Sequence, residues 1–290
     1  MLTNLLYGLL LCFLYPIAWL PKRVLFVLSD VVYFFFRYVP GYRKSVIYTN
    51  LARSFPEKSY SEIKSIANQY YRFFTGLFFE NIKTLGTSAK KAKKFISFEN
   101  IEIIDDYIQR GQSTVWVLGH FGNWEYLNFA GLHFNLKIAF KPQHGAVDKL
   151  MKRIRTHYCK SIIIPMQHIS RYMLTHRDEP VSYVFIADQS PAPTSKAWTT
   201  FLHQDSLFFE GAEKMATRLD LPVFYVDMQR VARGKYKVVF IKICDNPKSL
   251  PEFEITRRFA ALLEQSINRA PQYWLWSHKR WKHKLEKIKN

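Results

Sequence analysis

Residues 2–20 form an unbroken stretch without a charged side chain, and this stretch constrains the fold more than any other feature. As a helix rising 1.5 Å per residue it spans about 28 Å, close to the hydrocarbon thickness of a bilayer. Tyr15 and Trp19 suit the membrane interface, and Lys22 and Arg23 follow directly as flanking cations. The position of these cations predicts a transmembrane anchor with the main domain on the cytoplasmic side.

A secretory signal peptide is disfavoured at the N-terminus, because a basic start and a small-residue cleavage site are both missing. A second apolar run, residues 24–36, is rich in aromatic side chains, and we expect an interfacial or re-entrant helix there. A buried core helix is the alternative. The simplest division is an anchor, residues 1–40, and one α/β domain, residues 41–290.

From residue 101 onward, short apolar runs alternate with segments of helical periodicity. A continuous apolar run is typical of a strand that is buried on both faces. Strands are predicted at residues 113–118, 136–140, 162–164, 182–186, 223–228 and 237–243, and helices at 101–109, 147–158, 211–220 and 253–268. This alternation predicts an α/β fold with a mainly parallel central sheet flanked by helices.

Two segments before the sheet also carry clear patterns. Residues 61–84 have the spacing of an amphipathic helix, with Ser59 or Ser61 as its cap and Glu62 in its first turn. Its apolar stripe predicts core packing. The lysine-rich run at residues 90–94 predicts a solvated helix face, with a site for phosphate or acidic partners as the alternative.

The charge balance limits the classes of partner. With 42 basic and 23 acidic residues the chain carries a net charge of +19, which attracts nucleic acid, phosphorylated lipid or acidic proteins. No RRM, KH or zinc-finger pattern is present and the basic residues are spread along the chain, so nucleic acid is disfavoured. Cys12, Cys159 and Cys244 form no CxxC, and the histidines form no HExxH, so we expect neither a disulfide framework nor a metal site.

The segment Gly119-His-Phe-Gly-Asn-Trp-Glu125 lies where a buried strand ends and a helix begins, and ligands bind at this edge of open α/β sheets. On one continuous helix, positions five apart point about 140° away from each other. His120 and Glu125 therefore meet only if the chain turns between them, and Gly119 and Gly122 permit that turn. With Asn123 as the helix cap, the Glu125 carboxylate is expected to reach back to the imidazole.

Such a pair has a definite chemical use. A neutral imidazole can take a proton from a hydroxyl as that hydroxyl attacks an acyl carbonyl. The carboxylate selects the tautomer and stabilises the imidazolium that forms. No GxSxG nucleophile elbow is present, so direct attack by an acceptor hydroxyl is favoured over an acyl-enzyme. A chance HxxxxE spacing without catalytic meaning is the alternative.

At this point the chain resembles the late acyltransferases of lipid A biosynthesis, within the lysophospholipid acyltransferase superfamily. Beyond the His120-x4-Glu125 segment, four landmarks run in the family's order and extend the resemblance over nearly the whole chain. They are Lys141-Pro142 followed by Lys152-Arg-Ile-Arg155, then Asp188-Gln189, Phe208-Phe-Glu-Gly211 and Trp274-Leu-Trp-Ser-His-Lys-Arg-Trp-Lys282.

The resemblance implies transfer of a fatty acyl chain from acyl carrier protein to a hydroxyl of a lipid A precursor, at the inner face of the cytoplasmic membrane. It implies that His120 acts as base and that Glu125 supports it. Arg155 matches a family arginine near the active site, which we assign to a phosphate or to the developing oxyanion. Asp188 and Gln189 match a pair with a positional role. No metal or organic cofactor is expected, because a thioester is already activated.

The charge then has an explanation, since a phosphorylated glycolipid and the carrier protein are both acidic. Residues 141–171 carry seven Lys or Arg and one acid, so Lys141, Arg153 and Arg155 are expected to bind substrate, with a solvated basic helix as the alternative. Many relatives have Arg in place of Lys141. The tail 279–289 carries six basic residues, and Trp274, Trp276 and Trp281 precede or interrupt it. This pattern suggests attachment to an anionic membrane, with core packing of Trp274 as an equal alternative.

Some questions stay open at the level of sequence. The same chemistry on another acceptor, such as a lysophospholipid, an aminolipid or a glycosylated phosphoinositide, is the main alternative. A membrane-tethered nucleic-acid binder is the third reading, and the scattered basic residues disfavour it. The apolar stripe of residues 61–84 has a functional alternative as the wall of an acyl-chain tunnel.

Overall fold

The computed structural model describes residues 2–38, 41–157 and 162–283. Its centre is a seven-stranded sheet with the strand order β1-β9-β8-β2-β5-β3-β4. The strands are β1 (Ile96–Glu99), β2 (Thr114–Leu118), β3 (Leu136–Phe140), β4 (Ile162–Pro165), β5 (Ser182–Ile186), β8 (Val223–Ala232) and β9 (Lys235–Cys244). Every neighbouring pair is parallel except the β8–β9 hairpin, so the predicted α/β fold with a mainly parallel sheet is confirmed.

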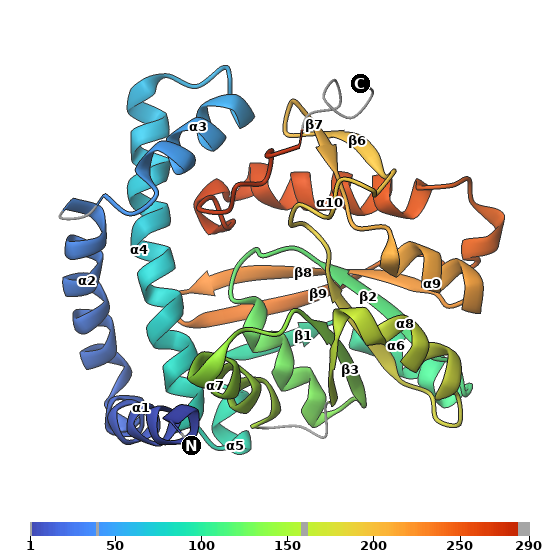
Figure 1. The fold of residues 1–290 in the computed structure, drawn as a ribbon, viewed down its shortest axis with the longest axis horizontal. Coiled ribbons are helices and arrows are strands. Elements are labelled where there is room, and N and C mark those ends of the chain that lie inside the picture. Colours follow the sequence, from blue (N-terminus) through green and yellow to red (C-terminus); the bar gives the residue numbers. More distant parts are fainter. Residues whose placement is uncertain (1, 39–40, 158–161, 284–290) are drawn as a thin grey trace.

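Helices cover both faces of this sheet (Figure 1). The α-helices are α1 (Leu2–Trp19), α2 (Lys22–Tyr38), α3 (Lys44–Ser54), α4 (Tyr60–Leu85), α5 (Ala89–Ala92), α6 (Ile101–Gln109), α7 (Gly145–Thr156), α8 (Met166–Thr175), α9 (Gly211–Leu219) and α10 (Glu254–Arg269). Three 3₁₀ helices are η1 (Trp124–Leu132), η2 (Pro247–Ser249) and η3 (Pro271–Tyr273), and a small hairpin consists of β6 (Trp198–Phe201) and β7 (Gln204–Leu207).

Strand β2 shows why the sheet forms. All five of its residues are buried, and successive side chains enter opposite faces. Val115 and Val117 pack in the larger core with α4 and α10, whereas Trp116 and Leu118 pack in the smaller core with α6 and η1. An apolar run without alternation is therefore what a central strand between two helical layers requires.

The predicted elements and the structure differ in places. Strand β1 and the β6–β7 hairpin were not predicted, because runs of four residues with polar ends carry little periodicity. Helix α8 was also missed. The helix expected from Trp124 is a 3₁₀ helix rather than an α-helix. The cap of α4 is confirmed: Ser59 and Glu62 form a reciprocal capping box.

The N-terminal helices lie outside α4, along the left-hand edge of the molecule in Figure 1. Helix α1 is long and apolar enough to cross a bilayer, and it is the one helix of the described residues that passes this test. Helix α2 buries one face, including Leu25 and Ser29, and exposes apolar residues such as Val27 and Phe34. It is thus an amphipathic surface helix, and the alternative of a buried core helix is wrong.

Candidate active site

The site begins at the sharp turn that follows β2. Two glycines make this turn possible. A Cβ at Gly119 would lie 2.6 Å from a Leu263 methyl carbon, and Gly122 has a φ of +62° with the Met228 carbonyl 2.8 Å from its hypothetical Cβ. The positive φ and the close backbone oxygen exclude a larger side chain at Gly122, whereas a larger side chain at Gly119 would require Leu263 to move. The turn therefore exposes His120 at the carboxyl end of a buried strand, where the sequence predicted a ligand site.

His120 is held by Asp188, which follows the neighbouring strand β5. The His120 side chain approaches the Asp188 carboxylate with a distance of 2.5 Å between Nδ1 and Oδ1. The His120 backbone N–H donates to Oδ2 at 2.8 Å, and the Trp274 indole N–H donates to the same oxygen at 2.8 Å. Because β2 and β5 are parallel neighbours, their carboxyl ends bring these residues together.

The environment of Asp188 fixes its ionisation. The residue is 2% exposed. Burial raises the pKa of the Asp188 carboxyl, but the charge interaction with His120 and the hydrogen bonds from His120 and Trp274 outweigh burial and hold this pKa below its usual range. An ionised Asp188 selects the imidazole tautomer with the proton on Nδ1. The lone pair of Nε2 is then directed to the other side, where the Gln189 amide lies 3.2 Å away.

The prediction that the Glu125 carboxylate contacts the His120 imidazole is wrong. The described hydrogen bonds include none between these two residues. Glu125 accepts two hydrogen bonds from Arg155 on α7, at 2.9 Å from Nε and 2.6 Å from Nη2, and one from the Trp124 indole at 3.2 Å. After Gly122 the chain enters η1, which turns Glu125 toward α7 and leaves the Trp124 ring against the imidazole, with centroids 4.9 Å apart.

In the Glu125–Arg155 pair the carboxylate is buried and the guanidinium is half-buried at the cavity wall. Burial raises the pKa of Glu125, but the Arg155 charge and hydrogen bonds outweigh it, so this pKa lies below its usual range. Burial likewise lowers the pKa of Arg155, and Glu125 more than compensates, so the net direction is upward. Both groups are therefore charged at neutral pH, and the guanidinium is fixed in position.

A cavity of about 660 Å³ adjoins His120. Its polar wall includes His120, Lys141, Arg155 and Gln189, and Glu125 also lines it. Its apolar wall includes Leu118, Leu127, Ile138, Phe140, Val184 and Ile186. Five of the seven predicted site residues thus line one cavity. A sixth, Asp188, does not line it but binds the His120 side chain.

Arg153 is the exception among these seven residues. It points from α7 toward α1 and donates to the Tyr15 hydroxyl at 3.0 Å from Nε and 2.7 Å from Nη2. It does not line the cavity. Positions two apart on a helix point about 160° away from each other, so Arg153 and Arg155 lie on nearly opposite sides of α7 and do not serve the same site. The prediction that Arg153 binds substrate there is therefore wrong.

A second cavity of about 680 Å³ lies between α2 and α4. Its lining is largely apolar and includes Val32, Phe36, Phe74, Leu77 and Phe78. Trp124 lines both cavities, so each cavity borders the residue that contacts the imidazole. His278 also lines the second cavity, and burial lowers its pKa to about 4, which keeps this imidazole neutral.

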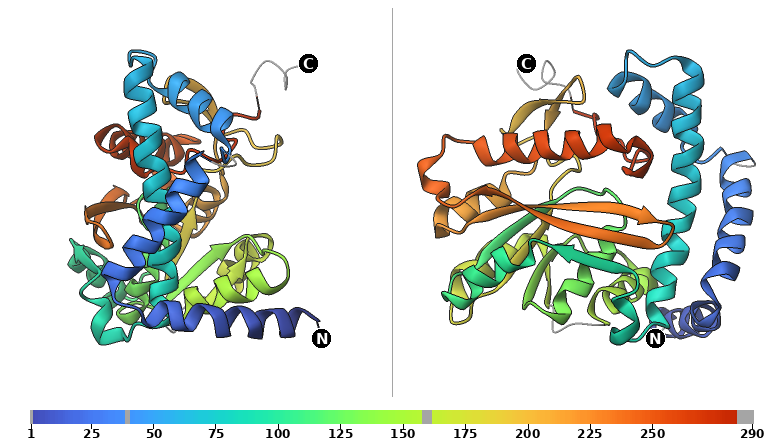
Figure 2. Two further views of the ribbon diagram at one scale, coloured as in Figure 1. Left: turned by 90° about the vertical axis from the view of Figure 1, so that its left-hand side faces the viewer. Right: turned by 180° about the vertical axis from the view of Figure 1, so that it is seen from behind.

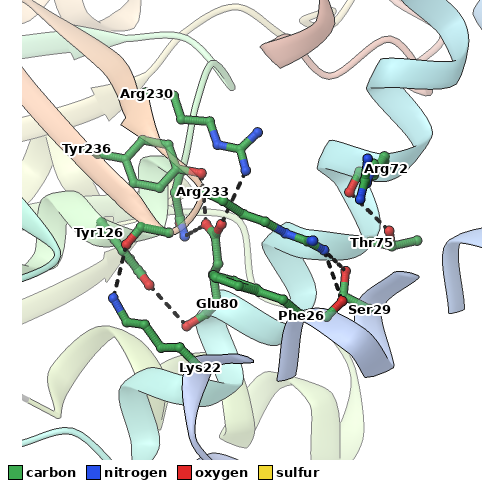
Figure 3. A network of polar contacts seen from close by, with 12 residues as sticks. Lys22, Phe26, Ser29, Arg72, Thr75, Glu80, Tyr126, Arg230, Arg233 and Tyr236 are labelled. Carbon is green, nitrogen blue, oxygen red and sulfur yellow. Dashed lines mark hydrogen bonds and ion pairs between the residues drawn. The ribbon is translucent and has the colours of Figure 1, made fainter. Parts of the chain in front are cut away.

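Sequence reasoning missed the buried residues that hold Asn123, which follows the turn at His120. Asn123 occupies the cap position of η1, but its side-chain amide makes no capping bond and donates to the Glu80 carboxylate at 3.1 Å. The Tyr236 hydroxyl donates to the same Glu80 oxygen at 2.8 Å, and Arg230 lies 4.0 Å from the other oxygen. Figure 3 shows this buried group, in which α4, β8 and β9 converge on Glu80. No local sequence pattern predicts a contact between residues so far apart in the chain.

The closing tryptophans are structural rather than membrane-facing. Trp274 and Trp276 are 2% and 0% exposed, so the reading of these two residues as membrane contacts is wrong and core packing of Trp274 is confirmed. Trp281 is half-buried and donates to the Ser206 hydroxyl at 2.7 Å. The basic tail after residue 283, like Cys159, lies outside the described residues. Trp274 therefore helps to hold Asp188 in place. The sequence motif at residues 274–282 includes Trp274 but does not indicate this role.

The residues gathered at this site suit acid–base chemistry. Within the described part of the chain, no three His, Cys, Asp or Glu side chains gather as metal ligands do. A neutral imidazole oriented by a buried carboxylate, next to a cavity with fixed cations, can deprotonate a hydroxyl of an anionic substrate.

Comparison with known proteins agrees with this chemistry. The family model of bacterial lipid A biosynthesis acyltransferases matches residues 1–283. No curated protein matches the chain. The family match spans the turn at His120, both cavities and the N-terminal helices.

Proposed function

Because the chain belongs to the bacterial lipid A biosynthesis acyltransferase family, we propose that it moves a fatty acyl group from acyl carrier protein to a hydroxyl of a lipid A precursor, with His120 as general base. The observation that carries this proposal is the His120–Asp188 pair beside the basic cavity. The anionic acceptor fits the Lys141 and Arg155 wall. The reaction takes place at the inner face of the cytoplasmic membrane, with residues 1–40 as anchor and residues 41–290 as catalytic domain.

The proposed reaction begins with a neutral His120. Nε2 takes the proton of the acceptor hydroxyl while the hydroxyl oxygen attacks the thioester carbonyl. Asp188 stabilises the imidazolium, as the acid of a catalytic triad does. When the tetrahedral intermediate collapses, the carbon–sulfur bond breaks and the imidazolium returns the proton to the leaving thiolate. The chain therefore needs no nucleophile of its own.

The proposed role of Glu125 differs from direct support of the imidazole. Glu125 holds Arg155 at the cavity wall with two hydrogen bonds, so that the guanidinium is oriented before substrate arrives. A fixed guanidinium can bind a phosphate group with two parallel hydrogen bonds. Lys141 adds a second positive charge, which is exposed on the same wall.

The apolar cavity between α2 and α4 is the proposed place for an acyl chain. Phe74, Leu77 and Phe78 belong to the apolar stripe of α4 and line this cavity. An acyl chain there would have its carbonyl end near Trp124, which contacts His120. In this proposal the apolar stripe of α4 has two roles. Part of it packs in the core, and part of it forms the wall of the acyl-chain cavity.

Mass spectrometry of lipid A tests the proposal. The source organism is compared with the gene intact, deleted, and restored as wild type, His120→Ala or His168→Ala; His168 is exposed and outside both cavities. Deletion should remove one acyl chain, and wild type and His168→Ala should restore it. His120→Ala should not restore it at an equal protein level. Unchanged lipid A together with a chain lost from another lipid would assign a different acceptor.

A further inference from the structure

Helix α1 does not project from the catalytic domain but lies along it. On α7, Arg153 hydrogen-bonds the Tyr15 hydroxyl and Lys149 hydrogen-bonds the Asn4 amide oxygen. The Lys149 ammonium also lies 6.0 Å from the centroid of the Tyr7 ring. Leu14 and Ala18 of α1 are buried in a small core that includes Leu150 and Ile154 of α7.

The end of α1 is fixed by α4. The Lys83 ammonium donates to the carbonyl oxygens of Ala18 and Leu20, both at 2.8 Å. Gly86 is so close that a Cβ there would lie 2.8 Å from the Ala18 oxygen. The catalytic domain thus contacts α1 from Asn4 to Leu20, which is about 24 Å of helix.

This arrangement is incompatible with a bilayer crossing by α1. Anything that packs along a crossing helix over 24 Å also lies at membrane depth. Helix α7 carries Asp148, Lys149, Lys152, Arg153 and Arg155 within twelve residues. A Lys, Arg or Asp at the centre of a membrane-spanning helix costs about 2.5–3.5 kcal/mol each. Helix α7 therefore belongs in water or at the interface, and α1 with it.

The two N-terminal helices share an outer apolar face. The exposed apolar residues are Leu2, Leu5, Leu6, Leu9, Phe13 and Trp19 on α1 and Val24, Val27, Leu28, Val31, Phe34 and Phe35 on α2. In the left view of Figure 2 both helices lie in front of α4. Helix α2 is fastened through Asp30, which accepts from Arg233 at 2.8 Å and from Arg72 at 3.1 Å. An apolar face this extensive on helices that are held in place marks an interaction surface.

A cleft of about 590 Å³ lies at the corner where α1 ends and α2 begins. Six lysines line it together with Phe95, and we name it the lysine cleft: Lys22, Lys83, Lys91, Lys93, Lys94 and Lys235. No acidic residue is part of this lining. Burial, together with the charges of Lys235 and Lys83, lowers the pKa of Lys22 to about 8 against the opposing effect of Glu80. An anion in the cleft would relieve this repulsion.

We propose that α1 and α2 form one membrane-binding face that lies in the plane of a single leaflet, with anionic lipid headgroups seated in the lysine cleft beside it. A broad apolar helix face next to clustered lysines is the combination that holds interfacial helices on anionic membranes. The N-terminus is then on the same side of the membrane as the catalytic domain. The apolar cavity between α2 and α4 is lined in part by Val32 and Phe36 of α2. The inference concerns attachment and stands whether or not the proposed acyl transfer is correct.

Topology decides the first part of the proposal. The same polar, protease-cleavable extension is placed before Met1 in one variant and after Asn290 in another, and protease is added to sealed inverted membrane vesicles. Both extensions should be cleaved to the same degree before detergent is added. Protection of the N-terminal extension with cleavage of the C-terminal one would show that α1 crosses the bilayer and would overturn the proposal.

Vesicle binding decides the second part. Purified Lys91→Glu/Lys93→Glu/Lys94→Glu protein is floated with phosphatidylcholine vesicles that contain or lack phosphatidylglycerol. Its binding to anionic vesicles should fall about tenfold or more, while binding to neutral vesicles stays unchanged. A matched control, Lys64→Glu/Lys214→Glu/Lys248→Glu, reverses three exposed lysines elsewhere and should fall far less. Equal losses in both variants, or loss of carrier-protein binding with normal vesicle binding, would overturn the headgroup assignment.

Discussion

Two buried carboxylates, Asp188 and Glu125, lie near the turn at His120, and they bind different partners. Asp188 follows β5 and binds an imidazole whose proton moves during the proposed reaction. Glu125 lies in η1 and binds the Arg155 guanidinium, which keeps its charge throughout. In both cases the interactions with the partner side chain outweigh the effect of burial and hold the carboxyl pKa below its usual range. In the proposed mechanism, the partner rather than the carboxylate itself decides whether a buried acid serves proton transfer or substrate placement.

The largest effect should come from Asp188→Asn. An amide at this position can favour the imidazole tautomer with its proton on Nε2, which cannot accept the hydroxyl proton. We expect kcat to fall about 10³- to 10⁴-fold, the scale of the corresponding change in a serine protease triad. The measurement is acyl transfer by purified protein in a detergent-based assay.

Asp178→Asn provides the matched control, since Asp178 is exposed and outside both cavities. It should keep wild-type activity. Near-normal activity of Asp188→Asn would show that Asp188 does not take part in proton transfer. The proposed difference between Asp188 and Glu125 would then be wrong.

Glu125→Gln should act mainly on stability and on acceptor binding. Removing one charge from a fully buried pair costs about 3–5 kcal/mol, and the loss should be smaller here because Arg155 is half-buried at the cavity wall. Chemical denaturation measures this loss, and the Glu125→Gln/Arg155→Gln double variant should recover part of it. In the kinetics, KM for the acceptor should rise more than kcat falls. A kcat loss as large as that of Asp188→Asn would instead return Glu125 to the role of imidazole partner.

Acid should expose the contribution of both carboxylates to stability. Each has a folded-state pKa below its unfolded value, so each adds stability that is fully present above the unfolded value and is lost as the pH falls through the folded one. Wild type should therefore lose stability from about pH 5 downward, starting from unfolded values of about 4. The Asp188→Asn/Glu125→Gln variant should lose less over the same range. Thermal unfolding scans at stepped pH measure the difference, and parallel curves would refute it.

The parts of the fold that depend on local sequence could be predicted. The apolar run of β2 and the glycines after it specify a buried strand and a sharp turn, and the Ser59–Glu62 pair specifies the start of α4. The partner of His120 could not be predicted, because nothing local states that β5 lies beside β2. Glu125 was chosen for its nearness in sequence, yet parallel strand order brings the more distant Asp188 to the imidazole.

The position of α1 shows a second limit. Length and hydropathy describe what a segment tolerates, and by that measure residues 2–20 suit a bilayer crossing. They do not reveal which helix packs along it. The contacts of Asn4 and Tyr15 with α7 join segments about 140 residues apart, and these contacts, rather than hydropathy, point to a position in the plane of one leaflet.

The most direct test of the central claim, that Asp188 orients His120, is nitrogen NMR of protein labelled with ¹⁵N-histidine, with the His120 signals identified by their loss in His120→Ala. In wild type and in Glu125→Gln, neutral His120 should carry its proton on Nδ1. In Asp188→Asn the proton should shift to Nε2 or become distributed between both nitrogens. An unchanged tautomer in Asp188→Asn, with a changed one in Glu125→Gln, would contradict the assignment of these two carboxylates.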